Sequence, residues 1–297
     1  MFFLFKKDFS TSSTIKWFYK KFLEIFIYPS VWVSAGLASL TIYTQDVLNL
    51  PEDWRPPLLI FSASLVFYNL DRIFDSYVQE IPDRKVQSFF RNKLVFFLLL
   101  SAVLVTLTLL FFAPQQVRLV SLGGLVPLLY GIPLFPLQLG QEENRWYRLK
   151  DIPGTKAWIV AGTLTYAVVA VPLAYANAGL DRSAILISLF LLIFIGTNSH
   201  LFDLRDVRSD FNKGVLTLPL MIGIQETRLL FTALNLLVLL GAILYWVSEL
   251  AILSPLTIGL ATLINIAIVW LPTPETPRNI YNIWIDGCLF LPILLNI

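Results

Sequence analysis

The stretch His200–Pro219, with the sequence HLFDLRDVRSDFNKGVLTLP, follows a charge-free run of residues 183–202 that is long enough to cross a bilayer as a helix. Asp203, Asp206 and Asp210 are spaced i, i+3, i+7, so at about 100° per residue they fall on one stripe of that helix. Three carboxylates on one stripe repel one another, and a divalent cation removes that penalty. Mg²⁺ typically takes one or two carboxylates together with waters and substrate phosphate oxygens. The stretch therefore predicts a magnesium site at the end of a membrane helix.

The composition of the whole chain agrees with a membrane location. Only 14% of the 297 residues are charged, against 57% that are hydrophobic, and the mean hydropathy is +0.72. A typical soluble domain has about 25% charged residues. The pattern predicts an integral membrane protein and excludes a soluble globule, a disordered chain and a collagen-like repeat. The single cysteine, Cys288, excludes an internal disulfide, and the net charge of +2 gives no indication of nucleic-acid binding.

Charge-free runs predict an all-α, polytopic membrane protein of about nine transmembrane helices. Seven runs approach or exceed the ~20 residues that a helix needs to cross hydrocarbon, and two shorter runs reach that length if a few carboxylates are tolerated inside them. The seven long runs are 25–45, 94–117, 119–141, 157–180, 183–202, 229–248 and 250–274, and the two shorter ones are 56–70 and 287–297. Prolines inside runs predict kinks rather than breaks, at Pro29, Pro127, Pro133 and Pro172.

The basic residues predict the orientation of these helices. Only Arg55, Arg118 and Arg182 fall in the odd-numbered loops, and the N-terminus and even-numbered loops hold the other 19 of the 22 Lys and Arg residues. Basic residues concentrate on the cytoplasmic side of membrane proteins. We therefore expect a cytoplasmic N-terminus, an outside C-terminus and both acidic clusters on the cytoplasmic side.

The N-terminal residues 1–24 are expected to form a cytoplasmic or interfacial segment before a single transmembrane domain over 25–297. Lysines interleave with Trp17, Phe18 and other apolar residues over 6–24, which is typical of an amphipathic helix at a membrane surface. A disordered basic tail over residues 1–14 is the alternative interpretation.

A second acidic cluster ends the run 56–70 and contains Asn69, Asp71, Arg72 and Asp75. Asp71 and Asp75 are four residues apart and share a helix face. Each carboxylate in a transmembrane helix costs roughly 2.5–3.5 kcal/mol on insertion scales, so such a pair indicates function.

The spacing D-x-x-D-x-x-x-D, followed by K-G and T-L-P, resembles the second aspartate motif of the UbiA superfamily of intramembrane prenyltransferases. The family form is close to D-x-R-D-x-x-x-D-x-x-x-G-x-x-T-L-P, and residues 203–219 match it almost throughout. The first cluster is similar to the family's N-D-x-x-D-x-x-x-D motif but departs from it. With Asp75 in the central acid position, Arg72 and Gln79 stand where acids are expected. The Tyr130–Pro133 segment and the stretch from Lys150 to Lys156 resemble the family's basic second cytoplasmic loop.

The resemblance implies a UbiA-like helical bundle that transfers a polyprenyl group from its diphosphate to an aromatic or lipid acceptor. The prenyl tail would lie among the helices, near membrane lipids, and the diphosphate would lie between the two acidic motifs. Mg²⁺ would bridge the diphosphate and the carboxylates of Asp71, Asp75, Asp203, Asp206 and Asp210, which are the candidate catalytic and metal-binding residues. The candidate substrate-binding residues are Asn69, Arg72, Tyr130, Lys150, Lys156, Asn198, Arg208 and Lys213.

Two other functions remain open from the sequence. The degenerate first motif is compatible with a non-catalytic protein of the same fold that binds a prenyl lipid. Buried acids are also found in ion-coupled transporters, but transporter sites lie near the bilayer midplane and these acids cluster at one face. A phosphotransferase of the CDP-alcohol type is disfavoured, since its D-G-x-x-A-R pattern is absent.

Overall fold

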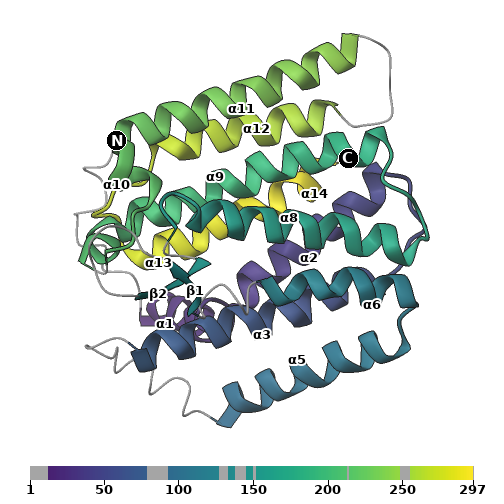
Figure 1. Ribbon diagram of the computed structural model, residues 1–297, viewed down its shortest axis with the longest axis horizontal. Helices are drawn as coiled ribbons and strands as arrows, with labels where there is room; N and C mark the ends of the chain where they lie inside the picture. Colours follow the sequence, from purple (N-terminus) through teal and green to yellow (C-terminus); the bar gives the residue numbers. More distant parts are fainter. Residues whose placement is uncertain are drawn as a thin grey trace.

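The computed structural model describes residues 13–78, 93–126, 133–137, 145–149, 152–212, 214–247 and 255–296. The described chain is a bundle of helices that run roughly alongside one another (Figure 1), as the apolar runs predict. The helices of the first half are α1 (Ser13–Phe22), α2 (Val31–Val47), α3 (Arg55–Val78), α5 (Lys93–Phe112) and α6 (Gln115–Ser121). Those of the second half are α8 (Lys156–Tyr175), α9 (Arg182–Asn212), α10 (Leu218–Ile222), α11 (Ile224–Val247), α12 (Pro255–Trp270), α13 (Arg278–Ile280) and α14 (Leu291–Leu295).

The C-terminal segment, residues 278–295, is helical throughout but irregular. A π-helical turn, Tyr281–Ile285, follows α13, and a 3₁₀ turn, Cys288–Phe290, precedes α14. The segment therefore begins nine residues before the predicted run 287–297 and includes Asp286. This agrees with the expectation that the short run extends into a longer helix with a carboxylate inside it.

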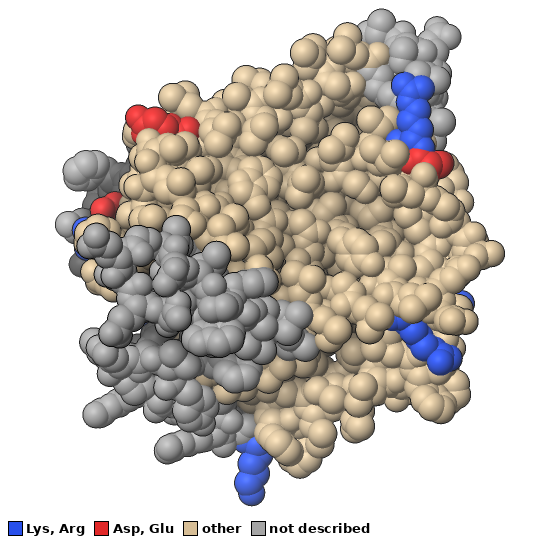
Figure 2. All heavy atoms as spheres, in the orientation of Figure 1, with Lys and Arg blue, Asp and Glu red and all other residues tan. Residues whose placement is uncertain are grey.

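Helix α9 lies at the centre of the bundle, packed against α8, α11 and α12. Of the apolar stretch of α9, 56% of the residues are buried inside the protein, against 11% for α5 at the edge. Side chains of α5 that face outward, such as Phe111 and Phe112, are more than 70% exposed. An apolar surface of this kind suits lipid, and Figure 2 shows a broad uncharged face with charged side chains near its margins.

Four helices of the described chain are long and apolar enough to cross a membrane: α5, α8, α9 and α11. A fifth candidate is the bent pair Ile15–Ile27 and Val31–Val47, whose two parts meet at 60°. Each of the nine predicted runs coincides at least partly with helical structure, but the number of spans stays a prediction.

The bend before α2 lies at one of the predicted prolines. A π-helical turn, Leu23–Ile27, leads into the turn that contains Pro29, and Ser30 has a positive φ of 60°. A π turn and a proline both interrupt the regular ladder of helix hydrogen bonds, so backbone carbonyls are released at this point.

The predicted span 119–141 is wrong in its second half. Helical structure continues from α6 through residue 126, but Pro133–Leu137 forms strand β1, which pairs antiparallel with strand β2, Arg145–Arg148. Proline removes a backbone donor that a helix needs and is tolerated at the edge of a sheet, and three prolines follow residue 126 in this run. Pro133 therefore begins a strand and does not kink a helix.

Candidate active site

The aspartate motif occupies the last three turns of α9, and the residues after it stop the helix and start the next one. Gly214 has a φ of +68°, the left-handed conformation that commonly ends a helix, and the N–H of Val215 donates to the carbonyl of Asp210 at 2.9 Å. Thr217 is extended at the N-cap of α10, with Pro219 in the first turn of that helix. Gly214 and the T-L-P part of the motif thus form the turn that fixes where the aspartate helix ends.

The loop before α8 is tied to this turn. Gly154, with a φ of +72°, donates its N–H to the carbonyl of Leu216 at 2.7 Å. This backbone bond brings the first residue of α8, Lys156, beside the end of α9. The pairing depends on a glycine conformation that other residues rarely adopt.

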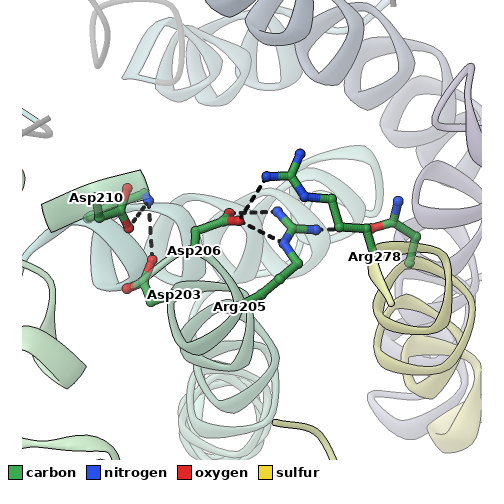
Figure 3. A network of polar contacts seen from close by, with 7 residues as sticks. Asp203, Arg205, Asp206, Asp210 and Arg278 are labelled. Atoms are coloured by element: carbon green, nitrogen blue, oxygen red, sulfur yellow. Dashed lines mark hydrogen bonds and ion pairs between the residues drawn. The ribbon is translucent and has the colours of Figure 1, made fainter. Parts of the chain in front are cut away.

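The three aspartates do not all face the same partner. Lys156 Nζ lies 2.8 Å from Asp210 Oδ2 and 3.4 Å from Asp203 Oδ1, so these two carboxylates converge on one cation. Figure 3 shows Asp203 and Asp210 on one side and Asp206 directed away from them. Residues seven apart differ by about 20° around a helix, whereas Asp206 lies about 60° from Asp203, which is enough to face another helix.

Asp206 points toward the C-terminal segment. Arg205 binds it with two hydrogen bonds, of 2.9 Å and 2.6 Å, and Arg278 Nη2 lies 4.0 Å from it. The same Arg205 donates to Asn282 Oδ1 at 3.2 Å and lies over the ring of Phe202. The sequence-based site did not include Arg278 or Asn282. Their signal was weak, a basic residue and an amide at the start of an apolar segment.

Two residues of the first cluster, Asn69 and Arg72, bind the backbone before α2. Asn69 Nδ2 donates to the carbonyl of Pro29 at 2.8 Å, and Arg72 Nη1 donates to the carbonyls of Tyr28 at 2.6 Å and Ile27 at 3.3 Å. The carbonyls of Tyr28 and Pro29 belong to the turn at the bend before α2, and that of Ile27 also accepts from the N–H of Ser30 at 3.1 Å. Asn69 and Arg72 therefore satisfy and fix the bend, because a buried carbonyl without a partner costs free energy.

The charges of the two clusters act on each other. Arg72 is within electrostatic range of Asp71, of Arg205 in the second motif and of Asp286 in the C-terminal segment. Asp71 itself is exposed at the surface of α3. Asp75 belongs to α3, but its side chain lies outside the described part. Asp286, which the sequence left without a role, is thus subject to the positive charges of Arg72 and Arg205.

The other predicted residues are only partly placed. Asn198 is buried and donates to the carbonyl of Ile285 at 3.2 Å, which ties α9 to the C-terminal segment. Arg208 is exposed on α9. Tyr130, Lys150 and Lys213 lie outside the described residues.

The carboxylates of Asp203 and Asp210 fit a divalent cation in their chemistry. Both side chains are at most 7% exposed and both bind one ammonium, so an organic cation already occupies the position between them. Within the described ranges, no group of three or more His, Cys, Asp or Glu residues gathers around one point. Two carboxylates suffice for Mg²⁺ when water and phosphate oxygens complete the shell.

Solved structures with the same architecture are known. A UbiA homologue from Archaeoglobus fulgidus bound to GPP and Mg²⁺ is 14% identical, with a TM-score of 0.62, and the match covers 93% of this chain and 97% of that one. A UbiA homologue from Aeropyrum pernix K1 is 13% identical, with a TM-score of 0.59 and coverage of 89% and 97%. A digeranylgeranylglyceryl phosphate synthase is 17% identical, with a TM-score of 0.56 and coverage of 93% and 96%. At these identities the likeness shows the fold.

The sequence has no match among curated proteins. The model of the UbiA prenyltransferase family, in contrast, matches residues 58–286, which include both acidic clusters and the whole of α8 and α9. This match covers most of the chain and confirms the resemblance, the all-α class and the membrane location. The chain therefore belongs to the UbiA prenyltransferase family.

Proposed function

We propose that the protein is an Mg²⁺-dependent transferase that moves a prenyl group from its diphosphate to an aromatic or lipid acceptor. The observation that carries the proposal is the convergence of Asp203 and Asp210 on one cation at the end of the central helix. Family membership supports it, as do the related structures that contain Mg²⁺ with GPP or DMAPP.

In this proposal Asp203 and Asp210 hold the metal, and Asp71 and Asp75 face it from the first cluster. When bound, Mg²⁺ supplies charge stabilisation to the diphosphate as it leaves. Arg205, which pairs with Asp206, and Arg72 would provide fixed positive charge for the same oxygens. Release of the diphosphate leaves an allylic cation, which the electron-rich acceptor attacks.

We propose that the remaining basic and polar candidates also hold the substrate. Arg208, Lys150 and Lys213 are proposed to contact the diphosphate, and Tyr130 and Asn198 the substrate nearer the bundle. Asn69 acts indirectly in this proposal, since its amide is already engaged with the bend before α2.

The acceptor is proposed as a class. The phosphate lipid in the name of the related synthase supports a lipid acceptor, and an aromatic acceptor is chemically equivalent in its attack on the cation. Both would approach from the membrane, because the outer surface of the bundle is apolar.

We further propose that the site faces the cytoplasm, with the N-terminus inside and the C-terminus outside. The distribution of Lys and Arg supports this orientation. Helix α1 supports an interfacial segment before a single domain over 25–297, since Trp17 and Phe18 are more than half exposed beside lysines.

The test is a membrane assay with labelled prenyl diphosphates of increasing length, with Mg²⁺ or with a chelator, followed by mass spectrometry of the lipids. Asp203→Asn and Asp210→Asn should each lower Mg²⁺-dependent product by at least about 100-fold, since a metal contributes several kcal/mol to such a transition state. The control is Glu52→Gln, an exposed acid on the loop between α2 and α3, which should leave the rate unchanged. Normal product formation by both aspartate variants would refute the assignment.

A second candidate is a non-catalytic prenyl-lipid-binding protein of the same fold. It is favoured by the engagement of Asn69 and Arg72 with backbone carbonyls, which leaves fewer donors of the first cluster for a diphosphate. Retained binding of a prenyl diphosphate, with no Mg²⁺-dependent product from any acceptor, would support it.

A further inference from the structure

Each aspartate of the second motif that the structure describes forms an ion pair with a basic side chain of the same protein. Lys156 serves Asp203 and Asp210, and Arg205 serves Asp206 with a bidentate pair. The repulsion expected among three aligned carboxylates is therefore relieved within the chain. A metal that binds Asp203 and Asp210 must compete with an ammonium that already occupies the position between them.

The position of Lys156 is not explained by its own helix. It is the first residue of α8, where the helix dipole disfavours a positive charge. The backbone bond from Gly154 to Leu216 nevertheless holds it against α9. Its side chain is 26% exposed, against 5% and 7% for Asp203 and Asp210, so the ammonium covers the two carboxylates from the more open side.

We propose that Lys156 is a resident counter-ion that a divalent cation must displace, and that the displaced ammonium then binds the diphosphate that arrives with the metal. This inference rests on the proposed function, both for the metal between Asp203 and Asp210 and for the diphosphate. A lysine has a compact charge on a flexible stem of four carbons, so its ammonium can leave the carboxylates while its backbone stays in place. An oxygen of a carboxylate that coordinates Mg²⁺ at 2.0–2.1 Å no longer serves an ammonium in the same place.

Removing the charge of Lys156 should change the affinity for a divalent cation in the opposite direction to removing a metal ligand. Removal of the lysine charge should strengthen binding of a divalent cation in the absence of substrate. A unit charge a few Å from a divalent ion is worth about tenfold or more in affinity at a partly exposed site. The same removal should weaken retention of the diphosphate on the metal-loaded protein, because its ammonium partner is gone.

The experiment measures Mn²⁺ binding by electron paramagnetic resonance on the purified full-length protein, without substrate. Lys156→Met keeps the length of the side chain and should lower the dissociation constant for Mn²⁺ by about tenfold. Lys156→Arg keeps the charge and should bind Mn²⁺ no more tightly than the parent. The matched control is Lys93→Met, an exposed lysine at the start of α5, which should leave the constant unchanged. Asp203→Asn added to Lys156→Met should abolish the gain, which locates the metal.

A second measurement needs no variant. The amine of Lys156 in the parent protein should react faster with an amine-modifying reagent when Mn²⁺ is added, and slower again when pyrophosphate is added with Mn²⁺, as quantified by peptide mass spectrometry. Unchanged or weaker Mn²⁺ binding by folded Lys156→Met, or labelling that Mn²⁺ does not increase, would overturn the inference. These readouts contain no prenyl transfer, so they can succeed where the transfer assay fails, and the reverse.

Discussion

A ladder of buried polar side chains joins three helices at the centre of the bundle, and its middle member should control stability. Asn235 of α11 donates to Thr197 Oγ1 of α9 at 2.8 Å and accepts from Asn265 Nδ2 of α12 at 3.0 Å. All three residues are at most 1% exposed. In this apolar setting the ladder helps to specify how α11 and α12 pack on α9, because hydrogen bonds depend on direction whereas apolar contacts do not.

The loss expected for Asn235→Leu can be worked from these contacts. Two bonds between membrane helices are worth about 0.6 kcal/mol each on average, so together about 1 kcal/mol. The amide of Asn265 is left buried without an acceptor, which adds about 1–3 kcal/mol. We expect the free energy of unfolding to fall by about 2–4 kcal/mol.

The assay is reversible unfolding in mixed micelles with increasing dodecyl sulfate, followed by circular dichroism and tryptophan fluorescence. Gln225→Leu is the matched control, the same kind of change at an exposed position of α11, and should cost less than about 0.5 kcal/mol. The double change of Asn235 and Asn265 to leucine should cost less than the sum of the two single changes, because no orphaned amide remains. An unchanged midpoint for Asn235→Leu, or strict additivity in the double variant, would refute the reasoning.

Two further predictions concern the loop that follows α2 and the packing of α2 against the C-terminal segment. Partial burial raises the pKa of Asp53, but the hydrogen bonds and charge of Arg55 outweigh this and hold the pKa below its usual value. The pair thus stabilises the folded state above the usual pKa of about 3.9, and this contribution disappears as the pH falls through the lower pKa of the folded state. Between pH 5 and pH 2 the free energy of unfolding should therefore depend less on pH in Asp53→Asn than in the parent. An identical pH dependence would contradict the pairing. A Cβ on Gly36 would lie 2.8 Å from Cβ of Leu289, so Gly36→Leu should abolish the monodisperse peak in size-exclusion chromatography while Gly241→Ala, which meets open space, leaves it intact.

Much of the bundle was predictable from hydropathy. A helix in lipid makes its backbone hydrogen bonds internally and exposes apolar side chains, so it is visible in the sequence as a long apolar run. The prediction failed over 119–141, where the composition stays charge-free but Pro133–Leu137 forms a strand that pairs with Arg145–Arg148. Hydropathy measures transfer into lipid and carries little information about the backbone bonds that proline removes.

The second motif was predictable for a different reason. The spacing of Asp203, Asp206 and Asp210 is local, so the helical period places them near one face whatever the rest of the chain does. The helical period did not indicate that Asp206 has a different partner from Asp203 and Asp210. A rotation of about 60° between Asp203 and Asp206 directs one toward α8 and the other toward the C-terminal segment.

The sequence by itself determined that this is a membrane-embedded helical bundle of the UbiA prenyltransferase family, with acids at the ends of two helices, because these features depend on local composition and spacing. Only the tertiary structure decided the partners: Lys156 between Asp203 and Asp210, and Arg72 on the carbonyls of the bend 45 residues before it. The physical reason is that a helix fixes the direction of its own side chains, whereas the side chains they meet depend on how distant helices pack.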